Sequence, residues 1–252
     1  MNTTFNTIYI LWLRQLKRYV RSKSRIIGSL AQPLLYLVAL GYGFGPIFQK
    51  AGQGNYIEFL APGIISMSII FTSIFAGIET LWDRQFGFLK ETLVAPVSRV
   101  NIMLGRTMGG ATVATLQGII VFIVSMLAGF QPVSWSMVPF AIVVMFLVAV
   151  LFTALGTAIA SLLDDMQGFQ LIVNFLVMPL FFLSGALFPL EGLPQLVSVI
   201  ASLDPLAYGV DAFRALLIGT SHFGLGLDIT VLVVVAAIFV GIGSYFFTKI
   251  EV

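Results

Sequence analysis

The sequence predicts an all-α integral membrane protein with six membrane-spanning helices. Of its 252 residues, 59% are hydrophobic and only 10% are charged, and the mean hydropathy is +1.03. About a quarter of a soluble chain is charged, so this chain has too few charged residues to cover a soluble globule. Six stretches reach the roughly 20 apolar residues that one helix needs to cross a bilayer. They lie at residues 26–48, 59–80, 104–130, 137–161, 169–188 and 227–248.

The beginning of the chain does not have the pattern of a cleavable signal peptide. Its first apolar run follows a long basic stretch, exceeds the length of a signal core and lacks a small-residue cleavage site. We therefore expect residues 1–252 to form a single transmembrane domain. The chain has no cysteine, which excludes disulfides, thiolate metal sites and thiol nucleophiles.

Lys and Arg are concentrated on one side of the six stretches. Only Lys50 and Arg214 lie on the other side. Because short loops rich in Lys and Arg stay in the cytoplasm, we expect both termini to be cytoplasmic. The modest net charge of +2 offers no basic surface for nucleic acid. The cytoplasmic set is Arg14, Lys17, Arg18, Arg21, Lys23, Arg25, Arg84, Lys90, Arg99, Arg106 and Lys249.

Residues 1–25 predict an amphipathic helix at the membrane interface. Aromatic and aliphatic side chains recur at helical spacing, while basic side chains occupy much of the remaining surface. This pattern is typical of a helix that lies flat on anionic lipid. A basic tail that only sets the topology is the alternative. The apolar residues are Phe5, Ile8, Tyr9, Trp12, Leu16, Tyr19 and Val20.

A charged segment, 82–100, separates the second and third stretches. We expect one cytoplasmic helix over Trp82–Val94, ended by Ala95 and Pro96, with Phe86, Leu89 and Leu93 on one face. Such a helix either connects two spans or docks another protein. The pattern alone leaves both possibilities open.

Within the spans, polar and small residues predict contacts between helices. Gly41–Gly45 and Gly105–Gly109 have the spacing that lets two helices approach closely. Four amides lie at membrane depth, and interhelical hydrogen bonding is the favoured role for each over contact with a substrate. They are Gln32, Gln117, Gln170 and Asn174.

Segment 189–217 is apolar but too short and too interrupted to cross the membrane twice. It predicts two helical pieces, from Gly192 to Leu203 and from Pro205 to about Leu217, with Asp204 as N-cap of the second. We expect a re-entrant hairpin in the outer leaflet. Asp211 and Arg214 have the i,i+3 spacing of a pair.

The residues and motifs that the sequence lacks count against several classes of function. No ionisable residue lies near a span centre, where an ion-coupled carrier would normally need one. Ser184 and His222 lack the glycine pattern of a serine hydrolase, and Asp164–Asp165 lacks the companions of a metal site. The chain also has no nucleotide-binding P-loop. No catalytic or metal-binding residue is therefore expected.

Three sequence blocks resemble the membrane subunits of ABC exporters of the daunorubicin-resistance type, within the drug and polysaccharide exporter permease class. The first two blocks are "DRQFGFLKETLVAPVSR" (83–99) and "LGRTMGGATVATLQG" (104–118). The third is "FFLSGALFPLEGLPQLVSVIASLDPLAYGVDAFRALL" (181–217). With the basic start and the six spans, the resemblance covers essentially the whole chain. The chain departs from the family pattern at Gln85, where many relatives have an acidic residue, and at Asp204, where asparagine is common.

The resemblance implies a half-transporter in the bacterial plasma membrane, moving a hydrophobic or amphipathic compound outward. It implies a second permease copy or paralogue and two separate ATPase subunits that bind ATP and Mg; this chain would bind no cofactor. The loop between the second and third spans would be the coupling helix. Its coupling residues would be Arg84, Gln85, Phe86, Gly87, Leu89, Lys90 and Glu91.

The resemblance also implies a path lined by the first, second and fifth spans and an external gate. The path candidates are Gln32, Tyr36, Asn174, Phe181 and Phe182. The gate candidates are Pro205, Tyr208, Asp211 and Arg214. An ion-coupled secondary transporter and a non-transporting membrane anchor or assembly subunit are the alternative functions.

Overall fold

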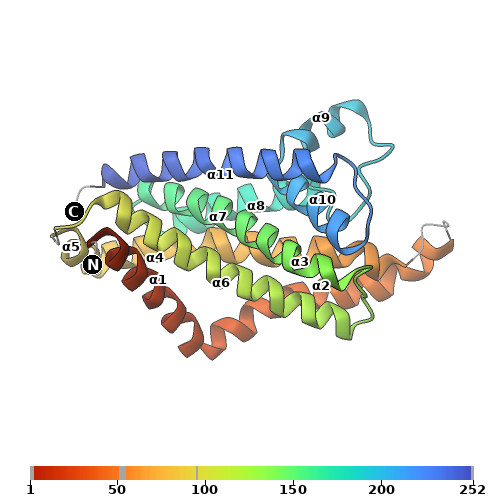
Figure 1. The fold of residues 1–252 in the computed structure, drawn as a ribbon, viewed down its shortest axis with the longest axis horizontal. Coiled ribbons are helices and arrows are strands. Elements are labelled where there is room, and N and C mark those ends of the chain that lie inside the picture. The colour runs from red at the N-terminus through yellow and green to blue at the C-terminus, as the bar shows by residue number, and fades with distance from the viewer. Residues whose placement is uncertain (1–2, 51–54, 95, 251–252) are drawn as a thin grey trace.

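The computed structural model describes residues 3–50, 55–94 and 96–250, and this part of the chain is built of helices. Figure 1 shows the long helices side by side along the longest axis, with the first and last described residues at the same end as α4 and α5. The elements are α1 Thr3–Arg21, α2 Lys23–Lys50, α3 Tyr56–Ala76, α4 Ile78–Gln85, α5 Phe88–Val94, α6 Arg99–Leu127, η1 Trp135–Met137, α7 Val138–Leu162, α8 Met166–Leu183, α9 Gln195–Leu203, α10 Pro205–Leu217 and α11 Leu225–Thr248.

The prediction of six spans is confirmed at the level of length and composition. In the described residues, six helical stretches are long and apolar enough to cross a membrane. The fifth, α8, ends at Leu183 rather than at residue 188, because the chain turns at Ser184 and Gly185, whose φ is +74°. Glycine adopts this left-handed conformation without a steric penalty.

Helix α3 occupies the centre of the bundle. It contacts α2, α6, α7, α8 and α10, and most of its residues are buried. Its buried side chains include Ile64, Met67 and Ile70 of the main hydrophobic core. The other long helices therefore keep one face toward α3 or α7 and one face outward.

Glycines allow the central helices to touch through their backbones. A Cβ added to Gly156 of α7 would collide with the carbonyl oxygen of Ile74 of α3, and one added to Gly77 would collide with the carbonyl of Gly156. A Cβ on Gly63 would likewise strike the carbonyl of Ala186. The predicted motif Gly41–Gly45 does not work this way, because an added Cβ at Gly45 would meet open space.

The amphipathic helix α1 packs along α6 at the second predicted glycine motif. A Cβ on Gly105 would approach Leu11 Cβ at 3.0 Å, and a Cβ on Gly109 would approach Gln15 Cγ at 2.6 Å. The indole of Trp12 also donates a 3.0 Å hydrogen bond to the hydroxyl of Thr112. One face of α1 therefore rests on protein; its place at the membrane interface stays a prediction.

The apolar segment after α8 folds into two short helices, as the sequence predicts. Helices α9 and α10 meet at an angle of 87°. Asp204 caps α10 by accepting a 2.8 Å hydrogen bond from the backbone N–H of Leu206, and Pro205 is the first helical residue. The first piece begins at Gln195 rather than at Gly192, after Pro194. Insertion of this pair into a leaflet stays a prediction.

We expect Gly156→Ala to lower the free energy of unfolding by about 1–3 kcal/mol, because α3 and α7 must separate to admit a methyl group. The thermal unfolding midpoint of the purified chain in detergent measures this change. Gly241→Ala is the matched control, since Gly241 lies within α11 with nothing within 4 Å of an added Cβ. Equal losses of unfolding free energy in Gly156→Ala and Gly241→Ala would show that the close contact between α3 and α7 does not determine the stability.

Candidate functional site

The charged segment between the second and third spans forms two helices rather than one. Helix α4 ends at Gln85 and α5 begins at Phe88, and Gly87 between them has a φ of +79°. The expected continuous helix over Trp82–Val94 is therefore wrong. A residue in the left-handed conformation ends an α-helix, and glycine adopts this conformation readily.

The break divides the predicted apolar face. Leu89 is fully buried and packs with Ile102 and Phe247, whereas Phe86 is 62% exposed. The side chains of Leu93 and Lys90 lie outside the described part of the structure. Phe86 and Leu89 are therefore not on one shared surface as expected.

Exposed aromatic side chains form a different surface on α4 and α5, which we call the aromatic ridge: Trp82, Phe86 and Phe88. Their exposed fractions are 41%, 62% and 54%. The rings of Trp82 and Phe86 stack at a centroid distance of 5.3 Å. Glu91 is also exposed on α5. Large apolar groups on a charged segment mark an interaction surface.

Two predicted coupling residues bind the turn between α7 and α8. Arg84 Nη1 lies 2.7 Å from Asp164 Oδ1, and Gln85 Nε2 donates to the carbonyl oxygen of Asp164 at 3.4 Å. Asp165 caps α8 by accepting from the N–H of Gly168. Arg84 and Gln85 therefore hold the end of α4 against this turn.

A buried ion pair joins α4 to α6, and two partly exposed ion pairs join α4 to α1. The carboxylate of Asp83 accepts hydrogen bonds from Arg106 Nη2 at 2.6 Å and from Arg14 Nη2 at 2.9 Å. Asp83 and Arg106 are each only 5% exposed. One turn earlier on α4, the carboxylate of Glu79 lies 3.6 Å from Arg18. We call these five residues the ion cluster.

The ion cluster was not predicted from the sequence. A signal was present, since Glu79 and Asp83 have the i,i+4 spacing of one helix face and Arg106 lies inside an apolar stretch. The pairing itself brings together residues far apart in the chain, so no local pattern could specify it. A buried ion pair needs both partners, because removing one leaves a charge without compensation.

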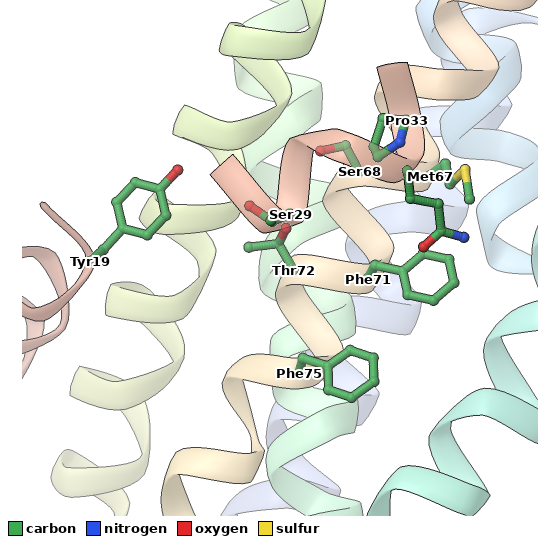
Figure 2. Close-up of a pocket in the computed structure, with 10 residues that line it drawn as sticks. Tyr19, Ser29, Pro33, Met67, Ser68, Phe71, Thr72 and Phe75 are labelled. Atoms are coloured by element: carbon green, nitrogen blue, oxygen red, sulfur yellow. The ribbon is translucent and has the colours of Figure 1, made fainter. Parts of the chain in front are cut away.

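A cavity of about 210 Å³ lies between the end of α1, the first half of α2 and the second half of α3 (Figure 2). Its wall combines aromatic rings such as Phe71 and Phe75 with hydroxyl groups. Ser68 is only 2% exposed, and its hydroxyl has no partner in the described structure. The lining residues are Tyr19, Gly28, Ser29, Gln32, Pro33, Met67, Ser68, Phe71, Thr72 and Phe75.

The side chains of the predicted path residues differ in their exposure. Gln32 lines the cavity and is exposed, and Tyr36, one turn further along α2, is partly buried. Asn174 and Phe182 are exposed on α8, whereas Phe181 is 1% exposed and belongs to the core. Phe181 therefore supports the bundle rather than facing outward.

The exposed amides lie on two helices that both contact α3. Gln32 lies on α2, and Gln170 and Asn174 lie one turn apart on α8. By contrast, Gln117 is fully buried and accepts a hydrogen bond from the Tyr19 hydroxyl. Among the hydrogen bonds of the described residues, Gln117 alone of the four amides has the interhelical role that the sequence predicts.

At the opposite end, Asp211 and Arg214 bind separate segments instead of pairing with each other. Asp211 accepts hydrogen bonds from the hydroxyl of Ser221 and from the backbone N–H groups of His222 and Phe223, at 2.8–2.9 Å for its closest oxygen atoms. Arg214 Nη2 donates to the carbonyl of Gly185 at 2.6 Å. The expected i,i+3 pair is therefore wrong, because each side chain finds a partner in a neighbouring loop.

The remaining gate candidates hold the bend between α9 and α10. The Tyr208 hydroxyl donates to the carbonyl of Ser202 at 2.7 Å, and its ring stacks on Phe223 at 4.7 Å. Pro205 begins α10. Ser184 donates to the carbonyl of Phe181, so its hydroxyl is engaged with its own helix end. This arrangement ties the hairpin to the beginning of α11.

The described residues contain six helical stretches that are long and apolar enough to cross a membrane, as expected for a multi-pass membrane protein. The family model described as "ABC-2 type transporter" matches residues 6–218, and the chain belongs to this family. Membership identifies a permease subunit rather than an enzyme and implies association with an ABC ATPase subunit.

Relatives cover most of the chain. Nodulation protein J of Rhizobium leguminosarum bv. viciae is 30% identical over 209 residues, which are 82% of this chain and 80% of that protein. Putative transport permease ycf38 of Cyanophora paradoxa is 28% identical over 267 residues, covering 98% and 91%. The ycf38 protein of Porphyra purpurea is 33% identical over 201 residues, covering 77% and 68%. The narrower resemblance to daunorubicin-resistance exporters stays a prediction.

We expect Asp83→Asn to lower the free energy of unfolding by about 3–5 kcal/mol, because Arg106 would keep its buried charge without a carboxylate. Thermal unfolding of the purified chain in detergent measures the loss. Asp164→Asn is the matched control: Asp164 is 85% exposed, and an exposed pair contributes at most about 1 kcal/mol. Similar shifts for the two variants would contradict a supporting role for the ion cluster.

Proposed function

We propose that this chain is the membrane subunit of an ATP-driven exporter that moves a hydrophobic or amphipathic compound out across a bacterial plasma membrane. Two permease chains act together with two ATPase subunits, which bind ATP and Mg. Both termini and the aromatic ridge are cytoplasmic, and the α9–α10 hairpin is external. Family membership supports the permease role. The exposed amides on α2 and α8 support a second permease chain and a path between the two chains.

The exposed amides carry this proposal. A carboxamide without partners costs several kcal/mol in hydrocarbon, so Gln32, Gln170 and Asn174 are unsuited to face lipid tails. The exposed side chains in the middle of α11, such as Val233 and Ile238, are apolar and suit lipid. The outward sides of α2 and α8 therefore face a second permease and the path between the two chains.

The aromatic ridge is the proposed contact with the ATPase. Helix α4, which carries Trp82, and helix α5, which begins at Phe88, lie at the same end of the bundle as the first and last described residues (Figure 1). Phe86 lies between these two helices. Aromatic residues of this kind are common anchors in protein interfaces. Arg84 and Gln85 fix the position of the ridge through Asp164, and Gly87 sets the angle between its two helices.

The ion cluster passes movement of the ridge to the spans. Asp83 lies three residues before Phe86 and is held by Arg106 of α6 and Arg14 of α1. A displacement of α4 by the closing ATPase dimer therefore moves α1 and α6 with it. Closely packed helices switch between discrete arrangements rather than deform continuously, which fits an alternation between inward- and outward-facing states.

The cavity fits a cargo that is mostly apolar with some hydrogen-bonding groups. Phe71, Phe75 and Met67 offer apolar contact, while Gln32 and the unpartnered hydroxyl of Ser68 offer polar contact. Small-molecule sites commonly combine an apolar wall with a few polar groups. Since charged side chains are absent from its described lining, this cavity favours an uncharged portion of the cargo.

We expect Phe86→Asp to weaken binding of the ATPase by about tenfold to several hundredfold, because a charge would replace an exposed anchor of the interface. Co-purification with the ATPase and cargo-stimulated ATP hydrolysis in proteoliposomes measure the effect. Val133→Asp is the control, since Val133 is an exposed apolar residue outside the ridge. If Phe86→Asp binds the ATPase and supports cargo-stimulated ATP hydrolysis as the unaltered chain does, the ridge is not part of the ATPase interface. Transport that ignores ATP and collapses with an uncoupler would favour an ion-driven carrier instead.

We expect Asn174→Cys to form a disulfide-linked dimer under mild oxidation, because the proposal brings two copies of α8 together where the permeases meet, and a disulfide needs Cα atoms within roughly 7 Å. The chain has no natural cysteine, so gel mobility without reductant reports this single link. Ile238→Cys on the apolar side of α11 should remain monomeric. If Ile238→Cys forms the dimer and Asn174→Cys stays monomeric, the second permease contacts α11 instead of α8, which contradicts the proposal.

A further inference from the structure

A basic cleft lies in the elbow where α1 ends and α2 begins. Its volume is about 870 Å³, and no acidic residue is among its described lining residues. The elbow lies farther along the bundle axis than α5, away from the end that carries the aromatic ridge (Figure 1). Its five cationic side chains are Arg14, Lys17, Arg18, Arg21 and Lys23.

Only part of this positive charge is compensated by the protein. Arg14 pairs with Asp83, and Arg18 pairs with Glu79. Among the ion pairs of the described residues, none involves the other three cations, Lys17, Arg21 and Lys23. Cations gathered in a concave surface create a positive potential that attracts an anion.

The rest of the cleft suits an anion that carries an apolar portion. Ser22 and Ser24 contribute hydroxyl groups, and Ile10 and Leu13 contribute apolar surface. Ile10 is 62% exposed, so its side chain is available for contact. Hydroxyl and cationic groups bind phosphate oxygens, and the apolar side chains can contact the glycerol and the beginning of the acyl chains.

We propose that the cleft in the α1–α2 elbow binds the headgroup of one anionic phospholipid from the cytoplasmic leaflet. The single negative charge of the bound headgroup offsets part of the positive charge of Lys17, Arg21 and Lys23, so it holds the elbow in place beside α6. The site goes beyond the transport function and depends only on the cytoplasmic position of the elbow. A basic pocket beside membrane-spanning helices at the cytoplasmic surface is a recognised type of site for anionic headgroups.

The test is binding of phosphatidylglycerol and phosphatidylcholine with identical acyl chains to the purified full-length chain, measured by native mass spectrometry. We expect preferential retention of one phosphatidylglycerol. The double variant Lys17→Gln/Arg21→Gln should weaken that binding roughly 30-fold, from the electrostatic contribution of two cations near a lipid headgroup. Phosphatidylcholine binding should not change.

The double variant Lys50→Gln/Lys249→Gln is the matched control, since it removes the same charge outside the cleft. Its phosphatidylglycerol binding should stay within about twofold of the unaltered chain, because no cleft cation is lost. Equal binding of the two lipids, or equal losses in both variants, would overturn the proposal. Unchanged thermal unfolding midpoints would confirm that both variants are folded.

A second measurement separates lipid from protein as the occupant. Because the chain has no cysteine, Ser24→Cys creates one reactive group in the cleft, whose labelling by a water-soluble maleimide can be followed in vesicles. Phosphatidylglycerol should slow the labelling several-fold relative to vesicles of phosphatidylcholine alone. If the ATPase slows labelling in phosphatidylcholine vesicles and phosphatidylglycerol does not, the cleft binds the protein partner and the proposal is wrong.

Discussion

The carboxylate of Asp83 lies between two guanidinium groups, and this contact joins the helices that the proposed mechanism must move together. Arg106 approaches it from α6 and Arg14 from α1, so three helices meet at one carboxylate. Asp83 and Arg106 are buried, and removing either partner leaves an uncompensated charge in an apolar setting. Helix α4 carries both Asp83 and Trp82 of the aromatic ridge. Arg14 belongs to both the ion cluster and the basic cleft. The surfaces that we propose for the ATPase and for lipid are thus both joined to the spans through the ion cluster.

The helices around the ion cluster are closely packed. Gly105 and Gly109 let α1 rest directly on α6, and Gly77 and Gly156 bring the backbones of the central helices together. Helices in contact through backbone atoms have little freedom to slide against each other. In the proposed mechanism, a displacement at α4 is therefore carried into the bundle rather than absorbed by loose side chains.

Polar groups show which surfaces need partners. At the end of the bundle where α9 and α10 lie, Asp211 and Arg214 satisfy backbone groups of two loops and so hold the α9–α10 hairpin in place. On α2 and α8, Gln32 and Asn174 remain exposed within stretches of membrane length. The same physical rule covers both cases: a polar group in an apolar setting needs a hydrogen-bond partner. In the first case the chain supplies the partner, and in the second we propose that another chain or water does.

The sequence by itself determined the six apolar helices, the amphipathic α1 and the cap of α10 by Asp204, because these depend on composition and local spacing. It also contained the glycine that ends α4, but helical periodicity concealed the break at Gly87. Only the tertiary structure decided that Leu89 is buried, that Asp211 and Arg214 bind different loops and that Asp83 meets Arg106. These outcomes depend on which segments lie next to each other after packing, and local patterns do not encode such neighbours.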